Sequence, residues 1–168
     1  MTDPVFLITS LVAVGSAIAA VTRRNPVYAA VWLLICFLSF AVILLQMAAP
    51  FLAAIHVLVY TGAILVLFVF VIMLLNLKDD ELGEEYGTGV WAAASALSLG
   101  LFGLMAWPIL ADPKLSAPLP ELPADFGSVE AVGRVLFVEY GLPFELVSLL
   151  IVVAMFGSMV LAKKRLWA

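Results

Sequence analysis

Beyond residue 24, three long stretches of this sequence contain no aspartate, glutamate, lysine or arginine, and they limit what the chain can fold into. They run over residues 25–77, 86–111 and 146–162. A helix that crosses a bilayer needs about 20 mostly apolar residues at roughly 1.5 Å of rise per residue. Hydrophobic residues make up 65% of the 168-residue chain, which is more apolar side chain than a soluble domain of this size can bury. We therefore expect an all-α integral membrane protein with lipid as its solvent.

The first stretch is long enough for two spans, which the sequence QMAAPFLAAIH divides at Gln46 and Pro50. The apolar segment PVFLITSLVAVGSAIAAV near the start adds another span. No internal repeat and no second domain is visible. We predict a single membrane domain over residues 1–168 with five transmembrane helices, near 4–22, 26–46, 53–77, 89–110 and 143–162.

Basic residues near the helix ends predict the orientation, because such residues are retained on the cytoplasmic side. With five spans, one side carries Arg23, Arg24, Lys78, Lys163, Lys164 and Arg165, and the other carries Lys114 and Arg134. We expect the N-terminus outside and the C-terminus in the cytoplasm. The protein would then be a multi-pass protein of the inner (plasma) membrane.

The first helix has a second reading as a cleaved secretory signal, because AIA at residues 17–19 fits a small-residue cleavage pattern. A signal peptide carries basic residues ahead of its apolar core. Here Asp3 precedes the core, whereas Arg23 and Arg24 follow it. This order favours an uncleaved helix.

A proline-rich segment over residues 111–128 separates the fourth and fifth spans and lies outside in this orientation. Its prolines exclude a regular helix and predict an extended surface segment: Pro113, Pro118, Pro120 and Pro123. The following sequence SVEAVGRVLFVEYG places apolar residues at helical spacing, which predicts a short helix at the membrane interface. The acidic loop KDDELGEEYG is expected in the cytoplasm.

The chain offers little for catalysis. Its one cysteine, Cys36, lies in an apolar stretch, and its one histidine, His56, begins the third span. The chain alone can therefore assemble neither a thiolate metal site nor an iron–sulfur cluster, and we interpret Cys36 as a small buried apolar residue. The glycines of GEEYGTG lack the strand and the Lys–Ser pair of a phosphate loop. We expect no catalytic residue, cofactor or metal in this chain, and no nucleic-acid partner.

Two ionisable side chains near the membrane have two readings each. Glu145 follows Pro143 at the start of the last helix, where the helix dipole favours a carboxylate. It is either a helix-start acid at the surface or part of a proton or head-group path. His56 lies one turn before Tyr60 and is either a satisfied interfacial histidine or a group that exchanges protons near neutral pH. The structural reading is the simpler one for both.

Three segments also carry a resemblance to a known family. RRNPVYAAVWLL begins the second helix, VLVYTGAILVLFVFVIMLLNL forms the third, and PFELVSLLIVVAMFGSMVLA forms the fifth. In this order they resemble subunit J of NADH-quinone oxidoreductase, the bacterial counterpart of chain 6 of mitochondrial complex I. The third segment is the most specific, because a tyrosine, a small residue, glycine and alanine ahead of a Leu/Phe/Val run are not expected from composition alone.

The resemblance implies a membrane-arm subunit of a respiratory complex that couples electron transfer to quinone with proton pumping. NADH, FMN, iron–sulfur clusters and quinone would be bound by other subunits. The partners would include the quinone-site and antiporter-like subunits, within the lipid bilayer. Related complexes use ferredoxin or a reduced deazaflavin, so the electron donor stays open. Some members have an acid at the position of His56, which puts a carboxylate relay there in doubt.

Two other function classes fit the composition. A small secondary transporter should show broken helices in two corresponding halves and polar sites at the midplane, and five spans without a repeat argue against it. A structural membrane scaffold stays open. It differs from a coupling subunit in whether changes at Tyr60 and Gly62 alter coupling or only assembly.

The third span carries three residues side by side that are unusual in a lipid-facing helix: Tyr60, Thr61 and Gly62. Glycine lets a neighbouring helix approach closely and makes the turn easy to distort. The resemblance implies a π-bulge here, an extra residue in one turn that disturbs the hydrogen-bond ladder. Steps of four and three place a set of residues on one helix face, namely Gly62, Val66, Val69, Met73 and Asn76. We call Val66, Val69 and Met73 the downstream face.

From these features we predict that Tyr60, Thr61 and Gly62 form a bistable segment. With the bulge, the downstream face is rotated relative to its α-helical setting, which makes or closes a hydrated link between the quinone end and the antiporter-like subunits. The hydroxyls of Tyr60 and Thr61 would bind freed backbone groups and water. The alternative is that Gly62 is only a packing notch and Tyr60 only an interface anchor.

Overall fold

The computed structural model describes residues 4–75, 87–111 and 122–163. All regular structure in these ranges is helical. Five helices are long and apolar enough to cross a membrane, as the sequence predicts: Pro4–Thr22, Pro26–Gln46, Pro50–Leu75, Thr88–Ala111 and Gly141–Ala162. The acidic loop up to residue 86 and residues 112–121 of the proline-rich segment lie outside the described residues.

Helices α1 (Pro4–Thr22) and α2 (Pro26–Gln46) pack closely against each other. The Asn25 side-chain oxygen accepts a hydrogen bond from Val27 N–H at 3.0 Å and caps the start of α2. At the far end of α2, Gln46 Nε2 donates to Thr9 Oγ1 at 3.1 Å. Small side chains allow membrane helices to approach closely, and the buried residues of the two helices are all small: Ala13, Ser16, Ala30, Ser39 and Ala41.

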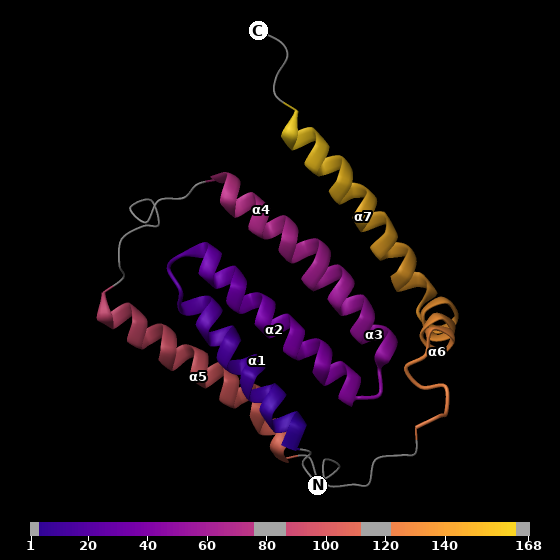
Figure 1. The fold of residues 1–168 in the computed structure, drawn as a ribbon, viewed down its shortest axis with the longest axis horizontal. Helices are drawn as coiled ribbons and strands as arrows, with labels where there is room; N and C mark the ends of the chain where they lie inside the picture. Colours follow the sequence, from indigo (N-terminus) through magenta and orange to yellow (C-terminus); the bar gives the residue numbers. More distant parts are fainter. Residues whose placement is uncertain (1–3, 76–86, 112–121, 164–168) are drawn as a thin grey trace.

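The third span consists of α3 (Pro50–Ile55), η1 (His56–Ile64) and α4 (Leu65–Leu75). The segment η1 is a π-helix, and α2 packs along the span (Figure 1). The prediction that the span begins near residue 53, after a break at Pro50, is wrong. Pro50 lies in the first turn of α3, where a missing N–H removes no hydrogen bond.

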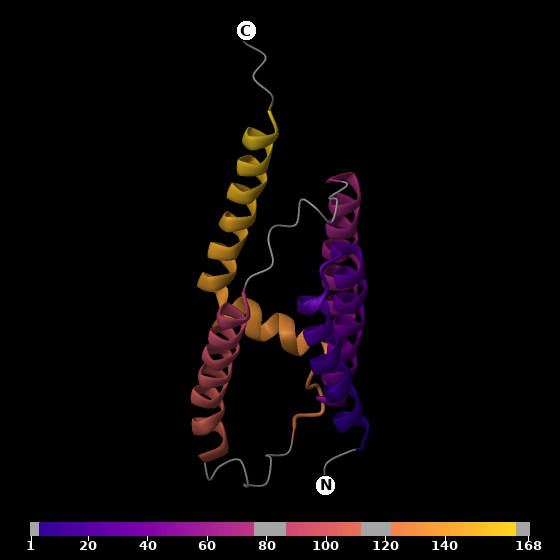
Figure 2. The ribbon, with the colours of Figure 1, turned by 90° about the vertical axis from the view of Figure 1, so that its left-hand side faces the viewer.

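Helices α5 (Thr88–Ala111) and α7 (Gly141–Ala162) stand apart from the first three spans. Figure 2 shows α1, α2 and the third span in one layer and α5 and α7 in a second layer. No residue of α5 or α7 is buried. Because both helices are apolar all round, they require lipid or other protein around them.

The short helix predicted after the proline-rich segment is present as α6 (Val129–Arg134) and η4 (Val135–Glu139), the latter a second π-helical segment. Ser128 caps α6, because its side-chain oxygen accepts a hydrogen bond from Ala131 N–H at 3.1 Å. In Figure 2 this segment runs crosswise to the spans and bridges the two layers. The extended conformation predicted for the proline-rich segment is wrong for its described part, where Phe126 N–H bonds to Pro123 O at 3.0 Å in a turn.

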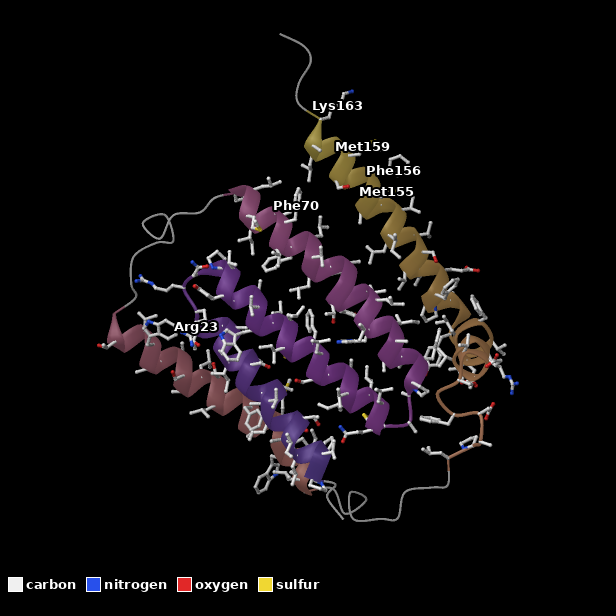
Figure 3. The ribbon with its side chains drawn as sticks, viewed as in Figure 1. Arg23, Phe70, Met155, Phe156, Met159 and Lys163 are labelled. Carbon is white, nitrogen blue, oxygen red and sulfur yellow. The ribbon has the colours of Figure 1, made fainter. Side chains whose placement is uncertain are left out.

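The first span begins and the last span ends at opposite ends of the molecule (Figure 1). Arg23 and Lys163, labelled in Figure 3, lie at the end where α1 and α7 finish. An odd number of crossings requires this separation. Which end faces the cytoplasm stays a prediction from the basic residues.

Candidate functional site

The candidate site is the π-helical segment η1 of the third span, which contains Tyr60, Thr61 and Gly62 among its nine residues. At its end, Leu65 N–H donates to Tyr60 O, five residues back instead of the four of an α-helix. The wide turn that the resemblance implies around Tyr60 is therefore present, and it extends over more than one turn. Such π-helical insertions occur frequently at functional sites.

The π segment sets which residues of the third span face the rest of the chain. The buried residues of this span are Ala53, Thr61, Leu65 and Ile72. In an α-helix, the face of Ala53 would return seven residues later at Tyr60. Instead Tyr60 is 47% exposed and Thr61 only 8% exposed. The extra residue in η1 therefore buries a hydroxyl in place of a phenol.

Thr61 and His56 each hold a buried polar atom without a hydrogen-bond partner in the described chain, Thr61 Oγ1 and His56 Nε2. Hydroxyls in the regular helices behave differently. Those of Ser16, Thr22 and Ser39 donate to carbonyls three or four residues back in their own helices. Buried polar groups in folded proteins are nearly always paired with protein or water, so these two atoms distinguish η1 from the other helices.

Aromatic rings from α2 pack around this turn. The His56 ring stacks on Tyr60, with centroids 4.8 Å apart, and on Phe40 at 5.9 Å. Phe37 meets the His56 and Tyr60 rings edge-on, at 5.8 and 6.0 Å. His56 therefore lies in a ring cluster, and both interpretations of this histidine stay predictions. The sequence reading missed Phe37 and Phe40, although their spacing of three already places them on one face of α2.

Gly62 lies on the exposed side of η1. A Cβ atom built there meets only Val57 O of the same helix, at 3.4 Å, so the predicted close approach of a neighbouring helix is not found within the described chain. The downstream face is largely open as well, because Val66 is 62% and Met73 66% exposed. Val69 is half-buried. This side of the third span is available to lipid or to another subunit.

The remaining candidates do not add to this cluster. Glu145 is exposed and lies beyond the first turn of α7, because that helix begins at Gly141 and not near residue 143. Cys36 is a half-buried free thiol in α2. Asn76 lies outside the described residues. Over the described ranges, no three His, Cys, Asp or Glu side chains come together in a group that could hold a metal ion.

Comparison with known proteins places the chain in a family. A family model described as NADH-ubiquinone/plastoquinone oxidoreductase chain 6 matches residues 16–161. The chain is 36% identical to NAD(P)H-quinone oxidoreductase chain 6 of Nostoc sp. over 160 residues, which cover 95% of this chain and 78% of that protein. It is 35% identical over 156 residues to NADH-quinone oxidoreductase subunit J of Pseudomonas aeruginosa, covering 91% and 92% of the two chains. Subunit J of Escherichia coli is 34% identical over 149 residues, covering 87% and 78%. The chain therefore belongs to the NADH-ubiquinone/plastoquinone oxidoreductase chain 6 family, which includes bacterial subunit J.

Proposed function

We propose that this chain is a membrane-arm subunit of a proton-translocating NADH:quinone oxidoreductase, and that its third span couples quinone reduction to proton pumping by switching η1 between π-helix and α-helix. The observation that carries the proposal is the burial of Thr61 in a π-helical turn, with no partner for its hydroxyl in the described chain. Family membership supports the assignment to the complex. The alternative is the equivalent subunit of a ferredoxin- or deazaflavin-linked relative.

Conversion of η1 to an α-helix would change the residues that face α2. One residue of an α-helix takes up about 100° of rotation, so the loss of one extra residue turns the downstream part of the span by about that angle. The inward face would then pass from Thr61 and Leu65 to Tyr60 and Ile64, one position earlier. The downstream face turns with α4. Packed helices favour discrete arrangements over continuous ones, so the segment has two states.

The polar atoms of η1 support a chain of water molecules through this part of the membrane. Thr61 Oγ1 and His56 Nε2 are buried without a described partner, and each can bond to water. The phenol of Tyr60, whose ring stacks on His56, adds a further donor. In the α-helical state Tyr60 takes the place of Thr61 on the α2 face, so the Thr61 hydroxyl leaves the row and its polar atoms are rearranged. The switch thereby makes or closes a hydrated link between the quinone end and the antiporter-like subunits.

Other subunits complete the site and carry the redox chemistry. We place NADH, FMN, the iron–sulfur clusters, quinone and the catalytic centre on those subunits, in an inner (plasma) membrane with the N-terminus of this chain outside. The absence of buried residues in α5 and α7 supports an assembly in which lipid and neighbouring subunits cover these helices. The exposed downstream face of the third span is the surface we expect an adjacent membrane-arm subunit to contact.

Replacement of Gly62 by leucine tests the proposal. Glycine destabilises a regular α-helix by about 1 kcal/mol relative to alanine, so Gly62→Leu should favour the α-helical state of η1. A complex held in that state should pump fewer protons per quinol formed. Gly103→Leu is the control, because Gly103 lies in α5 and a Cβ there meets nothing within 4 Å. A fall in the amount of assembled complex alone would indicate a scaffold. Normal coupling in an intact Gly62→Leu complex would exclude the switch.

A further inference from the structure

The described part of the proline-rich segment docks on the turn between α2 and α3 through Gly127. Gly127 O accepts a hydrogen bond from Phe51 N–H at 3.3 Å. The turn that leads to Gly127 is closed by the hydrogen bond from Phe126 N–H to Pro123 O. Gly127 and Ala49 are both buried at this contact. Two segments far apart in the sequence are therefore joined at the start of the third span.

The contact at Gly127 requires a residue without a side chain. Gly127 has a φ of +74°, a conformation that other residues rarely adopt. A Cβ built on it would lie 2.1 Å from Ala48 O and 2.9 Å from Ala49 Cα. These are backbone atoms, so no side-chain rotation relieves the overlap. Ala48 is itself in the left-handed region, with a φ of 56°, so the two turns fit backbone against backbone.

This junction holds the first turn of α3. The first N–H groups of a helix have no partner within the helix, and Gly127 O supplies one for Phe51. Phe51 is the second residue of α3 (Pro50–Ile55), and η1 begins directly after this six-residue helix. On the other side of η1, no described hydrogen bond joins α4 to another span. The two sides of the π segment are therefore held differently within the described chain.

We propose that Gly127 is a positioning residue that fixes the start of the third span. When η1 changes register, α4 then rotates and α3 stays in place. The inference rests on the proposed function, because it states which side of the switch moves. With α3 held, conversion of the wide turn to an α-helical turn rotates α4 (Leu65–Leu75) against α2. Gly127 also precedes the Ser128 cap of α6, and α6 crosses toward the layer of α7 (Figure 2). The junction thereby ties the last span to the fixed end of the third.

Gly127→Ala, measured in the whole complex in membrane vesicles, tests the role of this residue. The matched control is Gly133→Ala, because Gly133 lies in α6 and a Cβ there meets nothing within 4 Å. We expect Gly127→Ala to lower the protons translocated per quinol formed by more than it lowers the amount of assembled complex. Gly133→Ala should change neither. An assembled Gly127→Ala complex with a normal proton-to-quinol ratio overturns the inference.

Reversible disulfide bridges keep the inference testable if Gly127→Ala does not assemble. On a Cys36→Ser background, one cysteine pair joins α2 to α3 at Ala41 and Ala53, which are both buried and line one cavity. A second pair joins facing residues of α2 and α4. We expect the α2–α3 bridge to leave proton translocation per quinol unchanged and the α2–α4 bridge to abolish it until reductant is added. Loss of translocation with the α2–α3 bridge overturns the fixed start and leaves the switch standing. Normal translocation with both bridges overturns the switch itself and this inference with it.

Discussion

Replacement of Thr61 by valine removes the buried hydroxyl and keeps the shape of the side chain. Thr61 is 8% exposed, and its Oγ1 has no partner in the described chain. The proposed hydrated link requires that this hydroxyl bonds to water in the assembled complex. Thr61→Val would then remove that hydrogen bond from the π-helical state alone, because in the α-helical state Thr61 leaves the α2 face.

Thr61→Val lowers or raises the stability of the π-helical state, depending on whether the Thr61 hydroxyl is hydrated there. Loss of a made hydrogen bond costs about 1 kcal/mol, which shifts the equilibrium between the two states of η1 about fivefold toward the α-helix. Removal of a dry, unpaired hydroxyl would instead stabilise the π-helical state by about 1–3 kcal/mol. We expect the first result, together with a fall in the protons pumped per quinol formed.

The assay pairs two readings on the same purified complex: the temperature at which quinone reduction is lost, and proton uptake in vesicles relative to quinone reduced. Ser39→Ala is the control, because Ser39 is also buried and its hydroxyl donates to Ile35 O at 2.9 Å within α2. The control should couple normally. A Thr61→Val complex that is more heat-stable than its parent, or that pumps normally, would refute the hydrated link at Thr61.

Three other predictions concern the phenol, the topology and the assembly. Tyr60→Phe keeps the aromatic ring and should lower the proton-to-quinol ratio less than Gly62→Leu does; an unchanged ratio would remove the phenol from the path. Cysteine labelling should place residues near Glu84 and Arg165 in the cytoplasm and residues near Pro120 outside, all beyond the described ranges; opposite accessibility would contradict the N-out orientation. Gentle purification should recover the protein in a large quinone-reducing assembly, with no flavin, haem or metal on this chain. A stable monomer that transports a solute would favour a secondary transporter.

Helix limits could be read from the sequence where prolines and polar residues mark them. The first two spans have the predicted limits, and the fourth and fifth agree within two residues. The start of the third span was predicted late, because a proline that begins a helix looks the same in the sequence as a proline that breaks one. Asn25 ahead of Pro26 gives the clearer signal, since a capping side chain accompanies the proline.

The buried face of the third span could not be predicted from its spacing. A periodicity of 3.6 residues groups Gly62 with the downstream face, but it assumes an unbroken α-helix. The structure does place Gly62, Val66 and Met73 on one exposed side. What the spacing misses is that, across the π segment, Thr61 and not Tyr60 follows Ala53 on the buried face. Gly127 was missed for a different reason. Its requirement for glycine comes from Ala48, a residue far away in the sequence, and leaves no local pattern.

The most direct test of the coupling proposal is the structure of the third span in the assembled complex during turnover. In the structure described above, Leu65 N–H donates to Tyr60 O. We predict a second population during turnover in which Leu65 N–H donates to Thr61 O, four residues back as an α-helix requires. In that population Tyr60 should replace Thr61 on the face toward α2. If every population during turnover retains the hydrogen bond from Leu65 to Tyr60, the third span does not switch.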